Sequence, residues 1–312
     1  MEVGRFAPSP SGRMHLGNLF CSLLAWLSAR SAGGRVVLRI EDLDPLRCPR
    51  AFADEIERDL GWLGLFWDEG GSLGGPRGPY YQQERTALYA KACGLLAGRG
   101  LAYPCFCSRA QLHAASAPHR EDGAPVYPGS CRALTEAERA KRAKTRPPAL
   151  RLRVPNETVA FTDGHLGRYA ENLARDCGDF ILRRSDGVHA YQLAVVLDDA
   201  AMGVTQVVRG ADLLSSTPRQ IYLYRLLGLP APRFYHLPLL TDAEGRRLSK
   251  RDGDVSLERL RQKYTPEEVV GRLAFLAGLQ PAPAPRTAQS LVEGFSWEKV
   301  PREDIRIPKG LF

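Results

Sequence analysis

The sequence lacks the apolar segments that a membrane protein or a secreted precursor needs. No run of about 18 or more apolar residues occurs. The first ten residues, MEVGRFAPSP, hold neither the basic start nor the apolar centre of a secretory signal. With 312 residues, 44% hydrophobic and 25% charged, the chain can bury a large core. We therefore expect a globular cytoplasmic protein that has no membrane partner and acts as a monomer.

Cysteine is present in an odd number, seven, which argues against a disulfide framework. Four cysteines stand singly in apolar or mixed segments: Cys21, Cys48, Cys93 and Cys177. The other three, Cys105, Cys107 and Cys131, lie close together and need a separate explanation.

The common phosphate-binding loops are also missing. No GxxxxGK[ST] segment occurs, and no GxGxxG follows the first expected strand. No internal repeat is visible. A nucleotide site in this chain must therefore be built differently.

Positive charge is in excess, with 43 Lys and Arg against 35 Asp and Glu, a net charge of +8. This balance favours a polyanionic partner such as nucleic acid. A basic surface that merely reflects an arginine-rich, GC-rich genome explains the charge equally well.

The first 40 residues predict a strand, a helix and a second strand. An apolar run over 3–6 leads into a Pro-rich turn, and an apolar periodic segment over 16–29 follows. Gly33 and Gly34 end that helix, and the β-branched stretch 35–40 is the next strand. This βαβ unit predicts a doubly wound α/β fold of the Rossmann type with a parallel sheet.

The rest of the chain continues the α/β pattern. Further helices are expected over 49–65, 89–101, 217–227, 257–263 and 266–276, further strands over 150–154, 180–183, 190–196 and 204–208, and a stiff Pro-Ala linker over 281–285. We expect the nucleotide-binding fold to be split into 1–102 and 149–252, around an insertion over 103–148 and before a helical C-terminal region over 253–312.

The turn before the first helix has the character of an anion site. In Arg5-Phe6-Ala7-Pro8-Ser9-Pro10-Ser11-Gly12, proline stiffens a loop that leads to His15 and Gly17 at a helix start, where backbone N–H groups favour a phosphate. An ordinary surface loop shaped by Pro and Gly is the alternative. Much later, Leu248-Ser249-Lys250 places a lysine in a basic loop, which could meet charge on a leaving pyrophosphate or could simply be solvated.

These two motifs together resemble the paired signatures of class I aminoacyl-tRNA synthetases, in their glutamyl branch. The segments Leu38 to Asp44 and Val208 to Leu213 extend the resemblance, which runs from Arg5 to about Leu276. Asn18 and Arg247 depart from the two signatures at positions where glutamyl members commonly vary. The resemblance implies ATP as a substrate, with Mg²⁺, catalytic roles for His15 and Lys250, and an ATP site of Pro8, His15, Gly17, Asn18, Leu248, Ser249 and Lys250.

L-glutamate, the amino acid that the resemblance implies, needs cationic and hydroxyl partners for two carboxylates and an acid for its ammonium. We expect Arg5 and Arg209 to bind carboxylates, Glu41 to bind the amine, and Ser9 and Tyr191 to form hydrogen bonds through their hydroxyl groups. By resemblance the glutamate site comprises Arg5, Phe6, Ala7, Pro8, Ser9, Glu41, Tyr191 and Arg209. Each could instead make a structural ion pair, and the acids after Ile40 could be solvated.

The clustered cysteines suggest one structural Zn²⁺ in a reducing compartment. A fourth ligand is needed, and His113, His119 and Tyr127 are the candidates; ligand softness alone favours a histidine. The family's CxC and YxxxC pattern implies Cys105, Cys107, Tyr127 and Cys131. Reduced cysteines in a metal-free subdomain are the alternative.

From the short chain beyond Lys250 we expect no anticodon-binding domain of the kind that full-length glutamyl synthetases carry. The resemblance is therefore strongest to the truncated branch that places glutamate on the queuosine base at the wobble position of tRNA(Asp), which implies the anticodon stem-loop as partner. A glutamyl-tRNA synthetase that charges the tRNA 3′ end, or a non-catalytic tRNA-binding module, are the alternatives.

Overall fold

The computed structural model describes residues 1–108, 126–242, 244–246 and 256–312. Leu248, Ser249 and Lys250, and the candidate zinc ligands His113 and His119, lie outside the described residues. Among the described helices, none is both long and apolar enough to cross a lipid bilayer.

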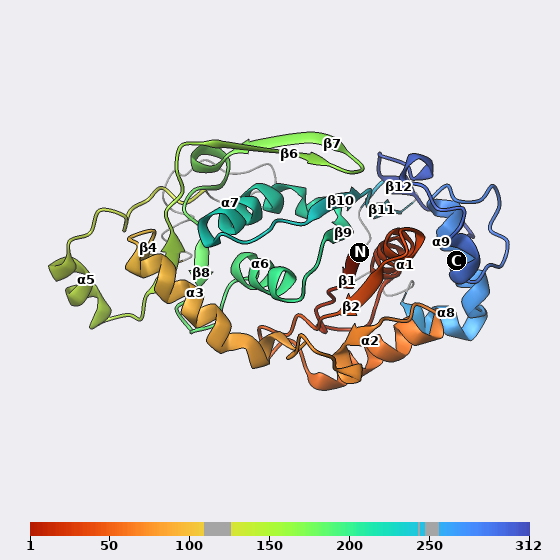
Figure 1. Ribbon diagram of the computed structural model, residues 1–312, viewed down its shortest axis with the longest axis horizontal. Helices are drawn as coiled ribbons and strands as arrows, with labels where there is room; N and C mark the ends of the chain where they lie inside the picture. The colour runs from red at the N-terminus through yellow and green to blue at the C-terminus, as the bar shows by residue number, and fades with distance from the viewer. Residues whose placement is uncertain (109–125, 243, 247–255) are drawn as a thin grey trace.

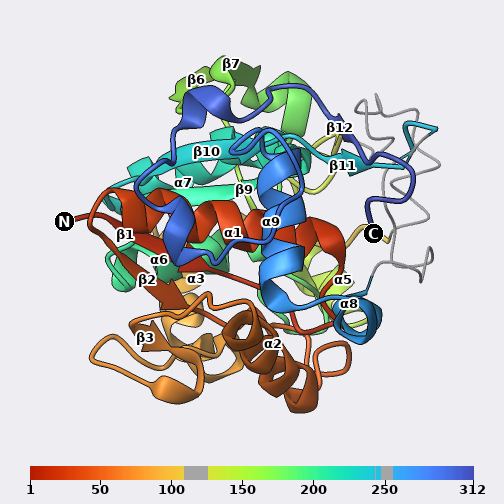
Figure 2. The ribbon, with the colours of Figure 1, turned by 90° about the vertical axis from the view of Figure 1, so that its right-hand side faces the viewer.

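A parallel sheet forms the centre of the molecule, as the sequence predicts. Its strands are β1 (Val3–Phe6), β2 (Arg35–Leu38), β3 (Glu69–Gly70), β9 (Gln206–Gly210) and β10 (Arg233–Leu237). The pairs β1–β2, β2–β3 and β9–β10 are parallel. β9 lies beside β1, where the Thr205 N–H donates to the Val3 carbonyl at 2.9 Å. The order is therefore β3-β2-β1-β9-β10, which Figure 2 shows from bottom to top.

Both faces of this sheet are buried, because successive side chains alternate between two apolar clusters. Val36, Leu38 and Val208 pack with α1 (Leu16–Ser31), α2 (Arg50–Trp62) and α9 (Pro266–Leu276). Val37 and Val207 face the other way, toward α3 (Thr86–Gly98), α6 (Tyr191–Ala201) and α7 (Thr217–Leu227). Helices on both faces define a doubly wound fold.

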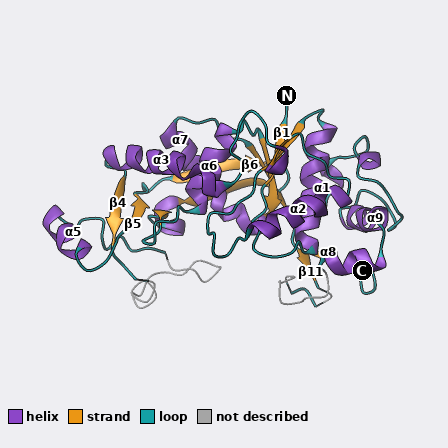
Figure 3. Cartoon of the chain, turned by 90° about the horizontal axis from the view of Figure 1, so that it is seen from below, coloured by secondary structure: helices purple, strands orange, loops and turns teal. Residues whose placement is uncertain are grey.

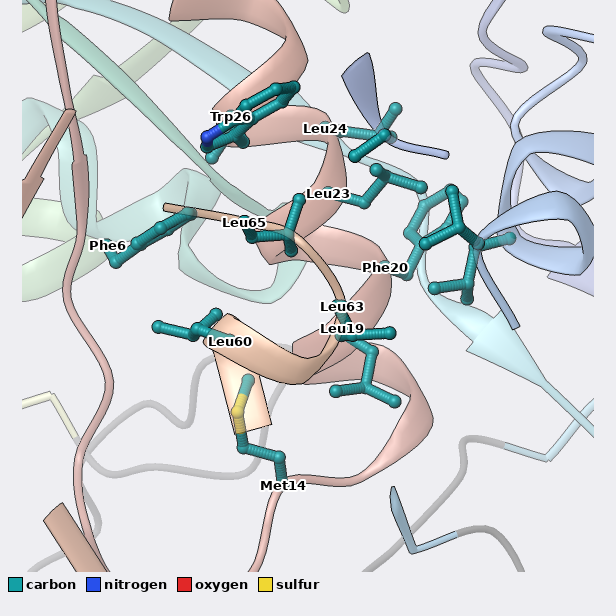
Figure 4. Packing of buried hydrophobic residues seen from close by; sticks show 14 of the residues in the cluster. Phe6, Met14, Leu19, Phe20, Leu23, Leu24, Trp26, Leu60, Leu63 and Leu65 are labelled. Atoms are coloured by element: carbon teal, nitrogen blue, oxygen red, sulfur yellow. The ribbon is translucent and has the colours of Figure 1, made fainter. Parts of the chain in front are cut away.

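Helix α1 is the central helix of the first cluster. Its Leu19, Phe20, Leu23 and Leu24 belong to the same buried cluster as Leu60, Leu63 and Leu65 from the end of α2 and the following turn, and Figure 4 shows their packing. The helix ends before Gly33, whose φ of 64° favours glycine. The Pro-rich turn connects β1 to the start of α1, so this packing fixes the position of the turn against the sheet.

The inserted region forms one end of an elongated molecule (Figures 1 and 3). Strand β4 (Ala102–Cys105) pairs antiparallel with β5 (Ala149–Leu152), which pairs with β8 (Ile181–Arg183). Tyr103, Phe106 and Tyr127 pack there around the cysteines in a small separate cluster. The helix α5 (Glu136–Ala143) lies outermost.

The C-terminal region forms the opposite end, with α8 (Leu257–Lys263) and α9 (Figures 1 and 3). The Pro-Ala stretch 281–285 is no free spacer, because it lies against α9. A Cβ on Gly271 would come within 2.0 Å of the Ala284 carbonyl oxygen. Farther on, β12 (Ile305–Arg306) pairs parallel with β11 (Leu240–Thr241).

One predicted strand is wrong. Residues 190–196 form the start of α6, not a strand. Tyr191, Val195 and Val196 are typical of strands, but a helix that is buried on most sides also reads as a continuous apolar run. The antiparallel hairpin of β6 (Thr158–Asp163) and β7 (Gly167–Asn172), as well as β10, was not predicted.

Candidate active site

A cavity opens where β1 and β9 lie side by side at the centre of the sheet. From this point the chain proceeds outward in both directions, β1 to β2 and β9 to β10. At such a switch point the carboxyl ends of the strands leave a crevice between their loops. The cavity has a volume of about 470 Å³. Among its lining residues are all the described residues expected to bind ATP or glutamate: Arg5, Phe6, Ala7, Pro8, Ser9, His15, Gly17, Asn18, Glu41, Tyr191 and Arg209.

Arg5 enters the cavity from β1 and is only 5% exposed. Its Nη1 donates to the Val208 carbonyl at 2.9 Å, which ties the side chain to the neighbouring strand. Its Nε lies 3.9 Å from a carboxylate oxygen of Asp199 and makes no hydrogen bond. The guanidinium is therefore placed by the protein while it keeps donor capacity.

Glu41 follows β2 and lines the cavity, and its carboxylate is held by a buried arginine. Arg39 donates from Nη2 to Glu41 Oε1 at 2.9 Å and from Nη1 to Asp199 at 2.5 Å. Burial raises the pKa of Glu41, and the Arg39 guanidinium opposes that change. Arg39 thus fixes the direction of a carboxylate that can accept hydrogen bonds from an ammonium group.

Arg209 stands opposite, on β9, and is 4% exposed. Its Nη2 donates to Thr217 Oγ1 at 2.8 Å and its Nε to His236 Nε2 at 3.0 Å. Its Nη1 reaches the Tyr191 hydroxyl at 3.4 Å. Tyr191 lies in the first turn of α6, so its hydroxyl reaches the site from a helix instead of the predicted strand. Burial raises the pKa of Tyr191, which keeps the phenol protonated as a donor.

His236 is buried between Arg209 and Asp163. Its Nδ1 lies 2.6 Å from Asp163 Oδ2. Burial lowers the pKa of His236; Asp163 opposes this and Arg209 adds to it. The imidazole is consequently neutral at physiological pH.

The start of α1 forms the other wall. Asn18 Oδ1 accepts the His15 N–H at 3.2 Å, which closes the first turn. A Cβ on Gly17 would come within 3.1 Å of the His15 ring, so glycine leaves space for that ring. The helix N-terminus and the loop of Ala7, Pro8 and Ser9 then face the same cavity.

The described residues on either side of the second signature lie near the cavity and the first signature. Leu240, before the segment 247–255, lines the cavity. Ser256, after it, pairs with His15 in an antiparallel bridge, and the Leu257 N–H donates to the Met14 carbonyl at 3.1 Å. The chain on each side of Lys250 therefore borders the site.

The described cysteines of the insertion come together as expected. The sulfur atoms of Cys105, Cys107 and Cys131 lie within 4.8 Å of one another, and those of Cys107 and Cys131 are 3.6 Å apart. The Tyr127 hydroxyl is 3.4 Å from Cys105 Sγ and 3.9 Å from Cys107 Sγ. Sulfurs on a tetrahedral ion at bonds of roughly 2.3 Å would be roughly 3.8 Å apart, so the cluster could hold a metal. Burial opposes ionisation of Cys105, but hydrogen bonds and Arg151 outweigh it and lower its pKa.

Comparison with known proteins decides the family. Residues 3–296 match the family described as tRNA synthetases class I (E and Q), catalytic domain. The chain belongs to this family. It is a ligase of the aminoacyl-tRNA synthetase type, and the expected family is confirmed.

Relatives of this class I synthetase carry two kinds of name. A "Glutamyl-Q tRNA(Asp) synthetase" of Symbiobacterium thermophilum is 54% identical over 99% of this chain and 96% of its own length. Another of that name, from Nitratidesulfovibrio vulgaris, is 52% identical with the same coverage. A "Glutamate--tRNA ligase 2" of Alkalilimnicola ehrlichii is 48% identical, and 58% of its length is matched. The crystal structure of a glutamate tRNA ligase from Elizabethkingia meningosepticum in complex with its amino acid has a TM-score of 0.85 at 28% identity, covering 99% of this chain and 68% of that one.

The sequence motifs of the synthetase missed the residues that support its cavity from behind. Arg39 belongs to the predicted strand 35–40 and to the segment Leu38 to Asp44 that extends the resemblance, but neither predicts a role for it, and no motif singles out Asp163, Asp199 or His236. The four residues share no local signal, because the partners in each pair lie far apart along the chain. The pairs Arg39–Asp199 and Asp163–His236 become visible only when the fold is known.

Proposed function

We propose that the protein activates L-glutamate with ATP to form glutamyl-adenylate without tRNA, and then transfers the glutamyl group to queuosine at the wobble position of tRNA(Asp). One observation carries the first half. Two buried arginines, a buried carboxylate and a helix N-terminus face a single cavity. Arg5 and Arg209 suit the two carboxylates of glutamate, and Glu41 suits its ammonium.

The proposed activation joins the α-carboxylate oxygen of glutamate to the α-phosphorus of ATP, while the bond to pyrophosphate breaks. His15 and the backbone N–H groups at the start of α1 would hold phosphate oxygens, with Pro8, Gly17 and Asn18 shaping the nucleotide site. Lys250, beside Leu248 and Ser249, would meet charge on the departing pyrophosphate, with Mg²⁺ entering as the ATP complex. A hydroxyl of the queuosine ring then attacks the anhydride carbonyl and AMP leaves.

The second half is supported by the relatives. The relatives from S. thermophilum and N. vulgaris, both named for tRNA(Asp), are matched over 96% of their length, whereas the glutamate–tRNA ligase of A. ehrlichii is matched over 58%. We propose that the anticodon stem-loop enters the cavity, in a monomeric cytoplasmic enzyme. Charging of a tRNA 3′ end is the second candidate, which the 48% identity to that ligase favours.

The acceptor is tested with labelled glutamate and three RNAs: tRNA(Asp) with queuosine, tRNA(Asp) without it, and tRNA(Glu). Nuclease digestion of each product then locates the label. We expect label only on the queuosine nucleoside of tRNA(Asp). Label on the 3′-terminal adenosine of tRNA(Glu) would select the second candidate.

We also propose that the cysteine cluster holds one structural Zn²⁺ through Cys105, Cys107, Tyr127 and Cys131. Three thiolates and a phenolate oxygen are a donor set that zinc accepts, and the cluster lies in the insertion, apart from the cavity. The ion would therefore support the fold of the insertion, and no step of the reaction passes through it.

Metal analysis and stability measurements test this site. We expect about one zinc per chain, and we expect Cys131→Ser to lose it and to unfold at lower temperature, since a missing ligand weakens the whole site. Cys93→Ser, at another buried cysteine, is the matched control and should keep the metal. The proposal would be contradicted if the purified protein contained no zinc, or if removing the zinc with a chelator left its unfolding temperature unchanged.

A further inference from the structure

A buried chain of polar groups connects the hairpin β6–β7 with the cavity. Asp163 ends β6, His236 lies on β10, and Arg209 lies on β9. Asp163 and His236 have 0% exposed side chains, and neither lines the cavity. Their hydrogen bonds lead to the cavity through Arg209, so they can affect a bound ligand by orienting that guanidinium.

The position of the protons along this chain follows from the arginine. An arginine Nε always carries hydrogen and can only donate. Since Arg209 Nε lies 3.0 Å from His236 Nε2, that nitrogen must accept. The proton of a neutral imidazole is then on Nδ1, which donates to Asp163 Oδ2 at 2.6 Å. Asp163 therefore selects the tautomer that can receive Arg209.

Asp163 is itself fixed by the backbone. Its Oδ1 accepts the N–H groups of His165 at 3.0 Å, Leu166 at 2.9 Å and His236 at 3.1 Å. These bonds leave Oδ2 for the imidazole. Thr217 Oγ1 accepts from Arg209 Nη2 at 2.8 Å and lies 3.3 Å from His236 Nε2. Arg209 Nη2 also donates to the Leu213 carbonyl at 3.4 Å. With Nε on His236, three donor positions of the guanidinium are occupied by the protein, and Nη1 remains beside Tyr191 at the cavity.

We propose that Asp163 and His236 are positioning residues for glutamate: they orient Arg209 through a fixed imidazole tautomer so that its Nη1 edge faces the bound carboxylate. The inference rests on the proposed glutamate site. The contacts predict an effect on glutamate specifically, because the ATP side of the cavity is formed by α1 and touches neither residue.

The test uses Asp163→Asn in the full chain, since asparagine keeps the shape of the side chain. Its oxygen would continue to accept the three backbone N–H groups, which turns the NH₂ group toward His236 Nδ1. The imidazole must then carry its proton on Nε2, where it meets the Nε–H of Arg209 donor to donor. Asp179→Asn is the matched control, because Asp179 is buried and accepts from Val154 N and Tyr103 but lies away from Arg209.

Two readouts are needed. In glutamate-dependent ATP–pyrophosphate exchange we expect Asp163→Asn to raise KM for glutamate at least tenfold, with KM for ATP changed less than twofold, and to narrow the preference for glutamate over glutamine. Asp179→Asn should change neither KM for glutamate relative to KM for ATP nor the preference for glutamate over glutamine. Equal effects on both KM values, or a fall in kcat alone, would overturn the positioning role. Absence of exchange in the wild-type protein would instead contradict the proposed function.

The second readout does not depend on activity. Nitrogen chemical shifts of ¹⁵N-labelled histidine distinguish the tautomers. We expect His236 of the wild-type protein to be protonated on Nδ1 and that of Asp163→Asn on Nε2. Protonation on Nε2 in the wild-type protein would overturn the inference, whatever the exchange assay gives. His236→Gln, whose amide oxygen can accept from Arg209, should restore part of the glutamate affinity that His236→Ala loses.

Discussion

At the scale of residues, the two cavity arginines are held by different kinds of partner. Arg5 lies near the carboxylate of Asp199, within a buried network of Arg39, Glu41 and Asp199. Among the described residues, the hydrogen-bond partners of Arg209 are neutral: an imidazole, hydroxyls and a carbonyl oxygen. A buried cation without a buried anion beside it is costly. Arg209 therefore favours an anionic ligand, and a glutamate carboxylate would remove that cost while a glutamine amide would not.

The neutral state of His236 makes a prediction for stability. Folding lowers its pKa from 6.5, through burial and through Arg209 on β9 and Arg5 on β1, against the opposing effect of Asp163 on β6. As the pH decreases below 6.5, His236 therefore becomes protonated in the unfolded chain but stays neutral in the folded protein. The free energy of unfolding should decrease with pH over this range, by at most about 1.4 kcal/mol per pH unit from this group, until the lowered pKa of the folded protein is reached.

Urea denaturation between about pH 8 and about pH 5 checks this effect. Other groups contribute their own slopes, so wild-type protein is compared with His236→Gln, which lacks the titrating ring. We expect the wild-type protein to lose stability relative to the variant as the pH falls below 6.5. A difference that stays constant over this range would mean that His236 keeps an ordinary pKa.

The residues proposed to bind ligand could be predicted from the sequence, whereas those behind them could not. Arg5, Glu41 and Arg209 belong to recognisable motifs, and Tyr191 was implied by the resemblance. The cavity brings all four together even though Tyr191 lies on a helix instead of the predicted strand. Asp163 and His236 are 73 positions apart and have no local signature. Their pairing depends on how the hairpin crosses the sheet, which periodicity does not encode.

At the scale of elements, the C-terminal strand β12 supports the cavity wall. It pairs with β11, and the Ile305 N–H donates to the Leu239 carbonyl at 2.9 Å. Asp304 accepts the Leu239 N–H at 2.8 Å. Leu239 and Leu240 both line the cavity. The last residues of the chain, whose role the sequence left undefined, are thus bound to the strand that precedes the segment of Lys250.

Replacing Asp304 should weaken this support. We expect Asp304→Ala to lower the free energy of unfolding by about 1 kcal/mol, the usual loss for one hydrogen bond to a backbone N–H. Glu303→Ala, at an exposed neighbouring carboxylate with the same charge, is the matched control and should stay within about 0.5 kcal/mol of the wild type. Urea denaturation measures both, and equal losses in the two variants would show that Asp304 contributes only its charge.

Elements with a clear period and clear ends were predicted best. Helices α7, α8 and α9 have the predicted bounds, because Pro or a cap begins each of α7 and α9, and Gly228 ends α7. The hairpin β6–β7 was missed although Asp163-Gly164 is a turn signal, because its strands have little apolar pattern: of their buried residues Val159, Asp163 and Glu171, only Val159 is apolar.

At the scale of the whole molecule, the net charge of +8 would attract the phosphates of an RNA partner. Strand β4, which ends at Cys105 of the cysteine cluster, lies at one end of the elongated body, and β1 and β9, which contribute to the cavity, lie away from that end (Figure 1). An RNA stem-loop that reached both regions would contact an extended surface. Each phosphate contact releases counterions, which makes such binding sensitive to salt. Binding of the small substrates inside the buried cavity has no comparable dependence.

Salt titration separates these two interactions. Between about 50 and about 200 mM salt we expect KM for tRNA to rise by at least tenfold, because several phosphate contacts are lost together. KM for glutamate, measured by exchange without tRNA over the same range, should change less than about twofold and serves as the internal control. If KM for tRNA does not depend on salt, the excess charge is a surface property without a role in recognition.

The most direct test of the central claim is ATP–pyrophosphate exchange by the purified protein without tRNA, with glutamate, glutamine or no amino acid. The account predicts exchange with glutamate, a rate near background with glutamine, and a strong loss in Lys250→Ala at unchanged unfolding temperature. No exchange with glutamate, or equal exchange with glutamine, would contradict it.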